Sequence, residues 1–378
     1  MPNFPMIQAA LERAVVDRVF PGAVLAVRQG GGQINTFTAG LVSTHEAARA
    51  VRPTTVYDLA SLTKPLSTVT ALVLLMQMGR CRLQDRVGSL LLELADSPIG
   101  TASLWHLLTH SSGLPGWRGY YERLSPDATV PTTEEDRCRA REALVGMIRD
   151  EALIYERGMR SLYSDLGFML LGMIVERCSG IPLQRFFRDH IAPLAGASQL
   201  GFVPAEWADD FLQHARRVGG DVAPTEHDVW RGRLLCGEVH DENAASLGGV
   251  AGHAGLFGTA EAVMAVSGVW AQAYHRRPTL LDPSLVEEFT CRQTAVPGSS
   301  WALGWDTPSP PSSAGRFLSE LSFGHLGYTG TSIWIDPIHE LEIVLLSNRV
   351  HPTRMNERIK EFRPMIHELV YREYVAGD

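Results

Sequence analysis

The chain has 378 residues, of which 45% are hydrophobic, and carries a formal net charge of −8. This length fits two or three domains or one large enzyme with an insertion, and the hydrophobic content is that of an ordinary globular core. No basic block or aromatic-basic stripe occurs, which argues against nucleic-acid binding. No window of about 18 unbroken apolar residues occurs either, so we expect no membrane span.

The five cysteines are scattered along the chain. An odd and sparse set argues against a disulfide framework and fits a reducing compartment. The first twenty residues lack the basic segment and unbroken apolar stretch of a secretory leader. We therefore expect a cytoplasmic protein, or a periplasmic one if a leader has been trimmed from this chain.

The N-terminal segment predicts a helix followed by a hairpin. Ile7, Leu11 and Val15 are at helical spacing, which predicts an amphipathic helix. Two apolar runs, residues 23–28 and 34–39, flank three consecutive glycines. Apolar runs around a glycine turn are typical of two paired strands.

Lysine is rare in this chain, and one of its two lysines follows a serine by three residues. Of 34 basic residues only Lys64 and Lys360 are lysine. Arginine stays protonated in proteins, whereas a buried lysine can act as a base, so Lys64 is a candidate for that role. Ser61 lies three residues earlier, on the same face of a helix predicted within residues 57–79. This is the geometry of a serine nucleophile with a lysine base; the alternative is a helix-start serine and a solvated lysine.

Residues 80–240 are mostly helical and rich in loops by pattern. The clearest helices are residues 104–108 and 168–176, and residues 117–140 are charged and predicted to be irregular and exposed. In the segment that starts at Tyr163, residues 163 and 165 of an extended strand point to the same side. The Tyr163 hydroxyl and the Asp165 carboxylate would then face one cleft; the alternative is a capping residue for the next helix, with the tyrosine in the core.

The last third of the chain predicts a helix over residues 260–275, strands over 332–335 and 341–346, and a C-terminal helix. A glycine-rich segment, residues 324–330, lies directly before the first of these strands. Its glycines allow a substrate to approach the backbone closely, and His325 within it donates, accepts or carries charge near neutral pH. The alternative is a plain turn with an exposed histidine.

Taken in order, the three segments resemble a known family signature. S-x-x-K, an S-D-N-like segment and a K-T-G-like segment mark the penicillin-recognising serine hydrolases. The chain resembles their class C β-lactamase-like branch, which comprises class C β-lactamases, low-molecular-weight D,D-peptidases and related esterases. Further segments that carry the resemblance are residues 107–115, 252–257 and 346–349, so the likeness runs over nearly the whole chain.

The resemblance implies a role for each matching residue. Ser61 would be the acylated nucleophile, Lys64 would take or hold its proton, and Tyr163 would act as partner base and then as acid to the leaving group. His325 falls where the family has Lys or His. The oxyanion hole would use the backbone N–H groups of Ser61 and Tyr328, and such donors are typically worth about 3 kcal/mol each. Gly327 belongs to the same substrate-facing turn.

Two residues depart from the family pattern. Asp165 replaces the usual Asn, which places an anion beside Lys64 and favours Tyr163 as the general base. Leu326 replaces the usual Thr or Ser, so one hydroxyl that would touch a substrate carboxylate is missing. With His325 in place of Lys, the site is a poorer trap for the carboxylate of a penicillin. Arg349 is a candidate replacement for that charge, although an arginine at a strand end is more often solvated or structural.

These features predict an α/β (α+β) enzyme of the β-lactamase/transpeptidase-like type. We expect an antiparallel sheet flanked by helices, formed by both termini (residues 1–79 and 241–378), with an inserted helical domain (80–240) and the active site at their junction. The expected activity is hydrolysis of small esters or amides through an acyl-enzyme. The alternatives are a β-lactamase or D,D-carboxypeptidase acting on β-lactams or D-amino-acid peptides, and a non-catalytic binding protein. No metal motif occurs, and no cofactor is expected.

Overall fold

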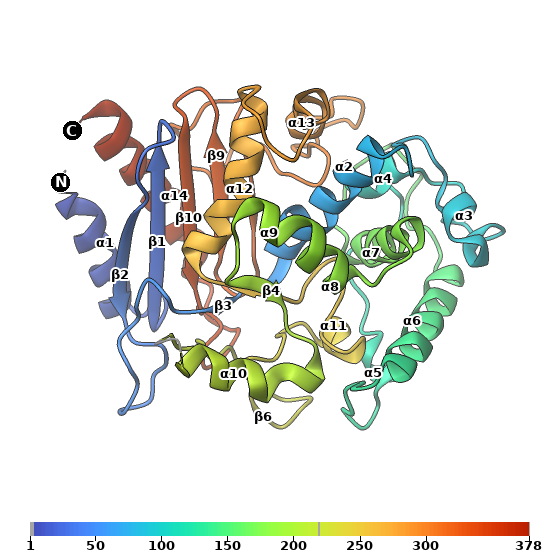
Figure 1. Ribbon diagram of the computed structural model, residues 1–378, viewed down its shortest axis with the longest axis horizontal. Coiled ribbons are helices and arrows are strands. Elements are labelled where there is room, and N and C mark those ends of the chain that lie inside the picture. Colours follow the sequence, from blue (N-terminus) through green and yellow to red (C-terminus); the bar gives the residue numbers. More distant parts are fainter. Residues whose placement is uncertain (1–3, 218–219, 378) are drawn as a thin grey trace.

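The main sheet is built from both ends of the chain, as predicted (Figure 1). The computed structural model describes residues 4–217 and 220–377. Five antiparallel strands follow the order β2-β1-β10-β9-β8. Their bounds are β1 (Gly22–Gln29), β2 (Asn35–Gly40), β8 (Phe323–Leu326), β9 (Ser332–Asp336) and β10 (Leu341–Ser347).

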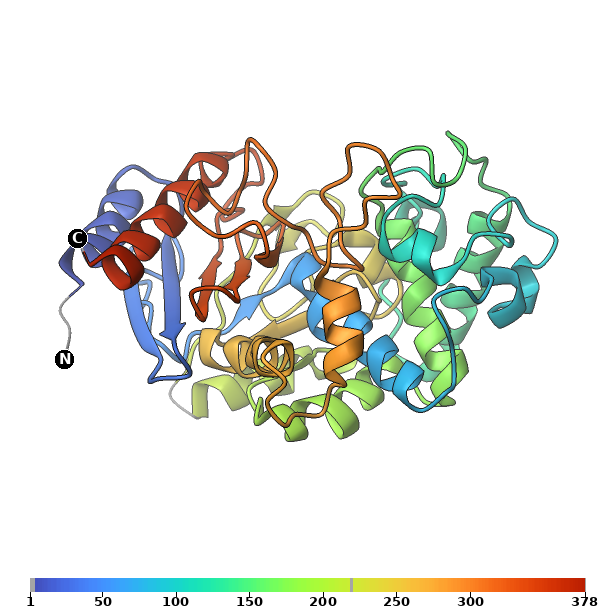
Figure 2. The ribbon, with the colours of Figure 1, turned by 90° about the horizontal axis from the view of Figure 1, so that it is seen from above.

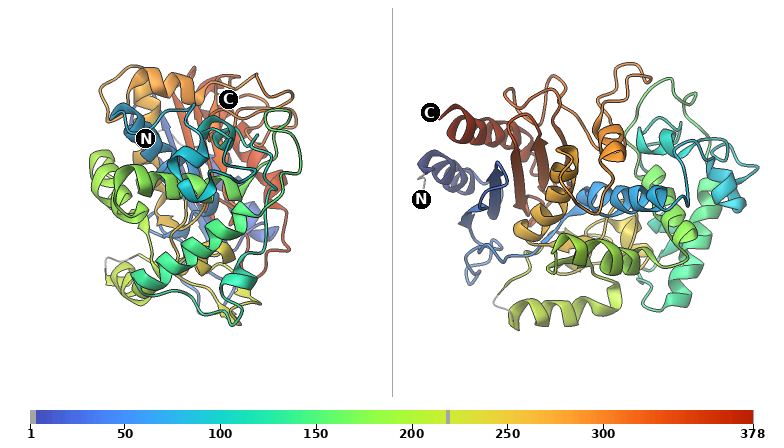
Figure 3. Two further views of the ribbon diagram at one scale, coloured as in Figure 1. Left: turned by 90° about the vertical axis from the view of Figure 1, so that its right-hand side faces the viewer. Right: turned by 45° about the horizontal axis from the view of Figure 1, so that its top comes forward.

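Helices cover both faces of this sheet. Successive residues of a strand point to opposite faces, so the apolar residues 23–27 of β1 contribute to two cores. Leu25 and Val27 pack in one core with α1 (Pro5–Val16) and α14 (Ile359–Tyr371), which lie side by side in Figures 1 and 3. Val24 lies in the other core, beneath α12 (Ala260–Tyr274). The predicted N-terminal hairpin is thereby confirmed as β1 and β2.

A small second sheet leads the chain into the predicted nucleophile. It has the order β3-β7-β4, from β3 (Tyr57–Asp58), β7 (Leu256–Gly258) and β4 (Leu200–Phe202). A further pair is β5 (His227–Asp228) with β6 (Arg233–Leu234). After β3 the chain forms one continuous helical run of three kinds: the 3₁₀ turn η1 (Ala60–Leu62), the π-helix η2 (Lys64–Val69) and α2 (Thr70–Gln77).

The middle of the chain is helical, and its first part, the cyan to green segment that contains α3 to α7, lies at the end of the molecule away from the two termini (Figure 2). Its helices and those that follow are α3 (Val87–Leu90), α4 (Leu104–Leu108), α5 (Tyr121–Leu124), α6 (Glu134–Arg149), α7 (Asp165–Ser179), α8 (Leu183–Phe186), α9 (Ala192–Ala195), α10 (Ala208–Arg217), α11 (Glu242–Ser246) and α13 (Pro283–Thr290). The predicted division of the chain at residues 80 and 240 remains a proposal. β4, which lies within the middle segment, pairs with β7 of the C-terminal part.

No single helix within residues 4–217 and 220–377 is both long and apolar enough to cross a membrane. One bent pair, α7 with the segment Leu183–Ala195, meets the length and composition criteria only when its two halves are taken together.

Two sequence expectations are wrong in part. Residues 117–140, predicted to be irregular, contain α5 and the start of α6. Thr133 caps α6 by accepting a hydrogen bond from the Asp136 N–H, and three acidic residues in the first turn complement the helix dipole. The sequence places the whole glycine-rich segment 324–330 directly before a strand, whereas His325 itself lies within the edge strand β8. Gly324 beside it leaves no room for a Cβ, which would lie 2.5 Å from the Trp334 ring; close packing of this kind explains why a glycine occurs inside a strand.

Candidate active site

The predicted nucleophile follows a strained residue that is held by a buried carboxylate. Ala60 has a φ of +47°, a left-handed conformation that is costly for a residue with a side chain. The Asp58 carboxylate accepts hydrogen bonds from the Ala60 N–H at 2.8 Å and the His240 N–H at 2.6 Å. Ser61, which comes next, is partly exposed and lines the main pocket.

Lys64 is fully buried beneath Ser61 and hydrogen-bonds it. Its Nζ donates to Ser61 Oγ at 2.8 Å, to Asp165 Oδ1 at 2.7 Å and to the His253 carbonyl at 3.4 Å. Burial by itself lowers the Lys64 pKa, but the Asp165 carboxylate and Tyr163 more than offset burial, so that the pKa is raised above its ordinary value. Lys64 is therefore an ammonium at neutral pH.

Tyr163 and Asp165 flank the lysine from the start of α7. The Lys64 Nζ lies 4.7 Å from the centre of the Tyr163 ring. Burial raises the pKa of Tyr163, while the charge of Lys64 lowers it; the net change is upward. Ser164, between the two residues, points away and caps α7 by accepting from the Gly167 N–H at 3.4 Å. Tyr163 and Asp165 thus both line the pocket, as the extended-strand interpretation predicted, while Ser164 has the helix-capping role that was the alternative.

His325 faces the pocket as a neutral imidazole. It is 2% exposed, and its Nδ1 lies 2.8 Å from the Leu326 carbonyl, which requires Nδ1 to carry the proton. Nε2, the acceptor, is buried and has no partner in the described part of the chain. Burial, assisted by the charge of Lys64, lowers the pKa of His325 to about 3. Of the roles that the sequence left open for His325, to donate, to accept or to carry charge, this geometry favours a neutral ring that accepts through Nε2.

Gly327 and Tyr328 form the turn between β8 and β9, at the mouth of the pocket. The Tyr328 side chain is 50% exposed, and its ring stacks on His240 with 5.7 Å between centroids. The predicted oxyanion role belongs to the backbone N–H of this residue.

Arg349 is held by the backbone rather than presented to a ligand. Its Nε donates to the Tyr328 carbonyl at 2.8 Å, and its Nη1 donates to the Arg354 and Asn356 carbonyls at 2.9 and 2.8 Å. The side chain is buried, and burial lowers its pKa. This geometry favours the structural role that the sequence left open for it.

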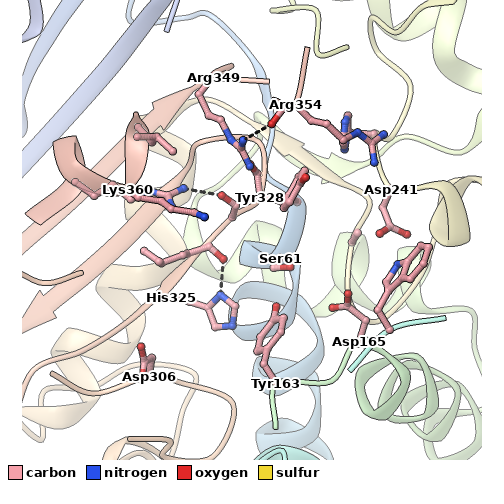
Figure 4. Close-up of a pocket in the computed structure, with 18 of the residues that line it drawn as sticks. Ser61, Tyr163, Asp165, Asp241, Asp306, His325, Tyr328, Arg349, Arg354 and Lys360 are labelled. Carbon is pink, nitrogen blue, oxygen red and sulfur yellow. Dashed lines mark hydrogen bonds between the residues drawn. The ribbon is translucent and has the colours of Figure 1, made fainter. Parts of the chain in front are cut away.

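A pocket of about 600 Å³ brings these residues together. Figure 4 shows Ser61 above Tyr163 and His325, with Tyr328 on the opposite side, and the Tyr163 and His325 ring centres are 6.0 Å apart. The lining comes from both the predicted sheet domain and the predicted insertion. In the described ranges, no group of three or more His, Cys, Asp or Glu side chains is arranged to hold a metal ion.

Proteins of known family are similar to this chain in sequence and in fold. A model of the Beta-lactamase family matches residues 7–363. The chain belongs to the Beta-lactamase family. This member is a serine hydrolase, as the sequence predicted.

Its relatives include enzymes named for two activities. "N-acetylmuramyl-L-alanine amidase" of Bacillus subtilis (strain 168) is 32% identical over 356 residues, 88% of this chain and 78% of that protein. "Putative D-alanyl-D-alanine carboxypeptidase" of Escherichia coli (strain K12) is 33% identical over 314 residues, 79% of this chain and 70% of that protein. The solved structure of "EstCE1, a hydrolase with promiscuous acyltransferase activity" has a TM-score of 0.73 at 18% identity, covers 97% of each chain and shows the shared fold.

The β-lactamase-family site also contains residues that the sequence did not single out for chemistry. Asp241 lines the pocket and accepts from His253 Nε2 at 2.8 Å. Burial tends to raise the pKa of Asp241, but His253 lowers it more, so the carboxyl is ionised. Trp301 stacks against Tyr163, with 5.5 Å between their rings. No spacing in the sequence connects these residues, because they lie on separate loops.

His110 is a further buried histidine beside the site in this family member. Its Nδ1 accepts from the Ser164 N–H at 3.1 Å, and its ring lies 4.7 Å from that of Tyr163. Burial, with Lys64, keeps its pKa well below the usual value. Through these contacts His110 orders the segment that carries Tyr163.

Proposed function

We propose that this serine hydrolase acts through an acyl-enzyme on Ser61 and prefers small esters or amides that carry no carboxylate near the scissile bond. The observation that carries the preference is the neutral His325, which occupies the position where its family has Lys or His. A neutral imidazole with a free Nε2 accepts a hydrogen bond and offers no charge to an anion.

Two other cations of the pocket lining, Arg349 and Arg354, support this preference. Arg349 is held by three backbone carbonyls, as described above. Arg354 is paired with Glu226 and Glu242, at 2.5 and 2.7 Å. The Arg349 guanidinium therefore already donates to backbone carbonyls, and the Arg354 guanidinium is already neutralised by two carboxylates.

In the proposed reaction, Ser61 Oγ attacks the substrate carbonyl and loses its proton to the phenolate of Tyr163, which is the minor form at neutral pH because the pKa of Tyr163 is raised. The Lys64 ammonium stabilises that phenolate and hydrogen-bonds Ser61, while Asp165 keeps Lys64 charged. The Ser61 and Tyr328 N–H groups would stabilise the oxyanion of the tetrahedral intermediate. Tyr163 then gives the proton to the leaving alcohol or amine. In the second half of the reaction Tyr163 takes a proton from water, which attacks the acyl-enzyme, and returns it to Ser61 Oγ as the acid product leaves.

The second candidate is a D,D-carboxypeptidase or amidase that acts on D-amino-acid peptides, with β-lactams as further substrates. Two observations favour it. The curated relatives carry the names amidase and carboxypeptidase. Lys360 also lines the pocket, at its exposed rim, where it pairs with Glu357 at 2.7 Å. Exposed pairs of this kind are weak, so this lysine is available to a substrate carboxylate. The third candidate, a non-catalytic binding protein, requires Ser61 to be inert.

A fluorophosphonate probe and a substrate panel separate these candidates. Intact-protein mass spectrometry should show one adduct on the wild type and none on Ser61→Ala. Short nitrophenyl esters should be turned over faster than nitrocefin or D-Ala-D-Ala peptides. Lys360→Met should leave ester turnover unchanged, whereas a selective loss of peptide turnover in that variant would establish the second candidate. An unlabelled wild type would leave only the non-catalytic candidate.

A further inference from the structure

Two buried arginines hold the turn that carries Tyr328. The turn spans residues 327–331 and is closed by the Gly327 N–H, which donates to the Thr331 carbonyl at 2.7 Å. Arg363, from α14, donates through Nη2 to the Gly327 carbonyl at 2.6 Å and to the Thr331 carbonyl at 2.8 Å. Arg349 donates to the Tyr328 carbonyl at 2.8 Å. Each arginine is 6% exposed.

The contact of Arg363 fixes the direction of the Tyr328 N–H. The Gly327 carbonyl and the Tyr328 N–H belong to one peptide group, and this peptide is trans. In a trans peptide these two bonds point in opposite directions. With the carbonyl held toward Arg363, the N–H must point away from α14. A cation on the carbonyl also polarises the peptide and strengthens its N–H as a donor.

The same turn is tied to the backbone just before Ser61. Thr329 Oγ1 donates to the Asp58 carbonyl at 2.7 Å, and Thr331 Oγ1 donates to the Leu59 carbonyl at 3.1 Å. Gly327 permits this approach, because a Cβ there would lie 1.9 Å from Thr331 Oγ1. The segments that carry the two predicted oxyanion donors are thereby held in one rigid unit.

We propose that Arg363 is the positioning residue of the oxyanion hole: its buried guanidinium orients and polarises the Gly327–Tyr328 peptide so that the Tyr328 N–H is a strong donor to the substrate oxygen. This inference rests on the proposed acyl-enzyme chemistry at Ser61. Burial, followed by the charge of Arg349, lowers the pKa of Arg363 to about 9, so the group remains a cation at neutral pH.

Arg363→Met tests the inference, with Arg349→Met as the matched control. Both variants remove a buried guanidinium from the same turn. Arg349, however, holds the carbonyl of the next peptide, whose N–H belongs to Thr329. The assay compares kcat and KM for a short nitrophenyl ester and its thiono analogue, in which sulfur replaces the carbonyl oxygen. Sulfur accepts hydrogen bonds poorly, so the oxygen-to-sulfur rate ratio reports on the oxyanion donors.

For Arg363→Met we expect kcat on the oxygen ester to fall by about tenfold or more, KM to change little and the oxygen-to-sulfur ratio to drop. The ratio should stay near the wild-type value in Arg349→Met. Arg363→Lys keeps the charge but has a shorter reach, so its oxygen-to-sulfur rate ratio should be higher than that of Arg363→Met. If Arg363→Met does not fold, the test is whether the oxygen-to-sulfur rate ratio of Arg363→Lys is lower than that of the wild type.

An unchanged ratio in the folded Arg363 variants would overturn the positioning role and leave a purely structural one. A wild type that is not labelled at Ser61 by the fluorophosphonate would instead refute the proposed function itself, so the two failures are distinguishable. Circular dichroism confirms folding in each variant.

Discussion

At Lys64, a single buried nitrogen serves three oxygen atoms. It contacts the Ser61 hydroxyl, the Asp165 carboxylate and the His253 carbonyl, in a space with no solvent exposure. A compact ammonium with three donors suits these directions, whereas the flat fork of arginine does not. This explains why lysine is retained here in a chain that otherwise uses arginine.

We therefore expect Lys64→Arg to lose nearly all ester turnover although the positive charge is kept. The bulkier guanidinium cannot reach Ser61 Oγ and Asp165 together without displacing one of them. Steady-state kinetics measures the loss, and circular dichroism checks the fold. Retention of more than about a tenth of the wild-type rate, a loss below about 1.4 kcal/mol, would show that the three-way contact is dispensable.

Asp165→Asn should shift the pH dependence of acylation. Because the carboxylate raises the pKa of both Lys64 and Tyr163, its removal lowers both, and burial also lowers the pKa of Lys64. The proton acceptor then becomes available at lower pH, so the rising limb of kcat/KM against pH should move toward neutrality. Ser164→Ala, a change at the neighbouring residue that faces away, is the control. An unmoved limb would show that Asp165 does not set the protonation of the site.

At the level of the element, β8 determines what the pocket offers to a substrate. It places His325 on the pocket side of the sheet edge and continues directly into the turn that holds Tyr328. The strand is short and lies at the edge of the sheet, where no further named strand covers it. A change of charge on this strand therefore acts directly on substrate preference.

His325→Lys should narrow the gap between ester and nitrocefin turnover at pH 8. The wild-type imidazole is uncharged there, since its pKa is about 3, whereas lysine would add a cation for the lactam carboxylate. A charge-assisted contact is worth roughly 1.5–3 kcal/mol. Steady-state kinetics of His325→Lys and Asp165→Asn on both substrates shows whether the missing cation at position 325 or the carboxylate of Asp165 sets the preference. If only Asp165→Asn raises nitrocefin turnover, then repulsion by that carboxylate is the discriminating feature.

Elements with strong local patterns could be predicted from the sequence, and those that depend on distant partners could not. The β1–β2 hairpin and the spacing of Ser61 and Lys64 are local, because turn glycines and helical periodicity determine them. The three-residue β7 has no such pattern and exists through its pairing with two other short strands. Arg363 matters through its contacts with Gly327 and Thr331, which are far from it along the chain and which no spacing reveals.

For the whole molecule, buried carboxylates make stability depend on pH. Burial raises the pKa of Asp306, on the pocket wall, to about 6, although Ser300 and the Thr307 N–H hydrogen-bond it. A raised folded-state pKa contributes stability at low pH that is lost as the pH rises through about 6. The difference from the ordinary value of 3.8 corresponds to about 3 kcal/mol at most.

Asp306→Asn should accordingly become more stable relative to the wild type as the pH is raised from 4 to 8. The amide oxygen still accepts both hydrogen bonds but carries no charge to bury. Urea unfolding at several pH values measures the difference, and Glu320→Gln, at an exposed position, is the control. A pH-independent difference would show that the pKa of Asp306 is the same in the folded and the unfolded protein.

Because β1 pairs with β10, the order of synthesis has a consequence for when the enzyme becomes active. The Ser61 segment leaves the ribosome early, but β8–β10 and Arg363 follow more than 250 residues later. Until then the edge of β1 that β10 will cover is open, which is the kind of exposed edge that promotes aggregation of nascent chains. A stalled or truncated chain that ends before α14 would contain the serine and the lysine but no anchored turn opposite them, and so would remain inert. We therefore expect the proposed activity to require a chain that extends through α14.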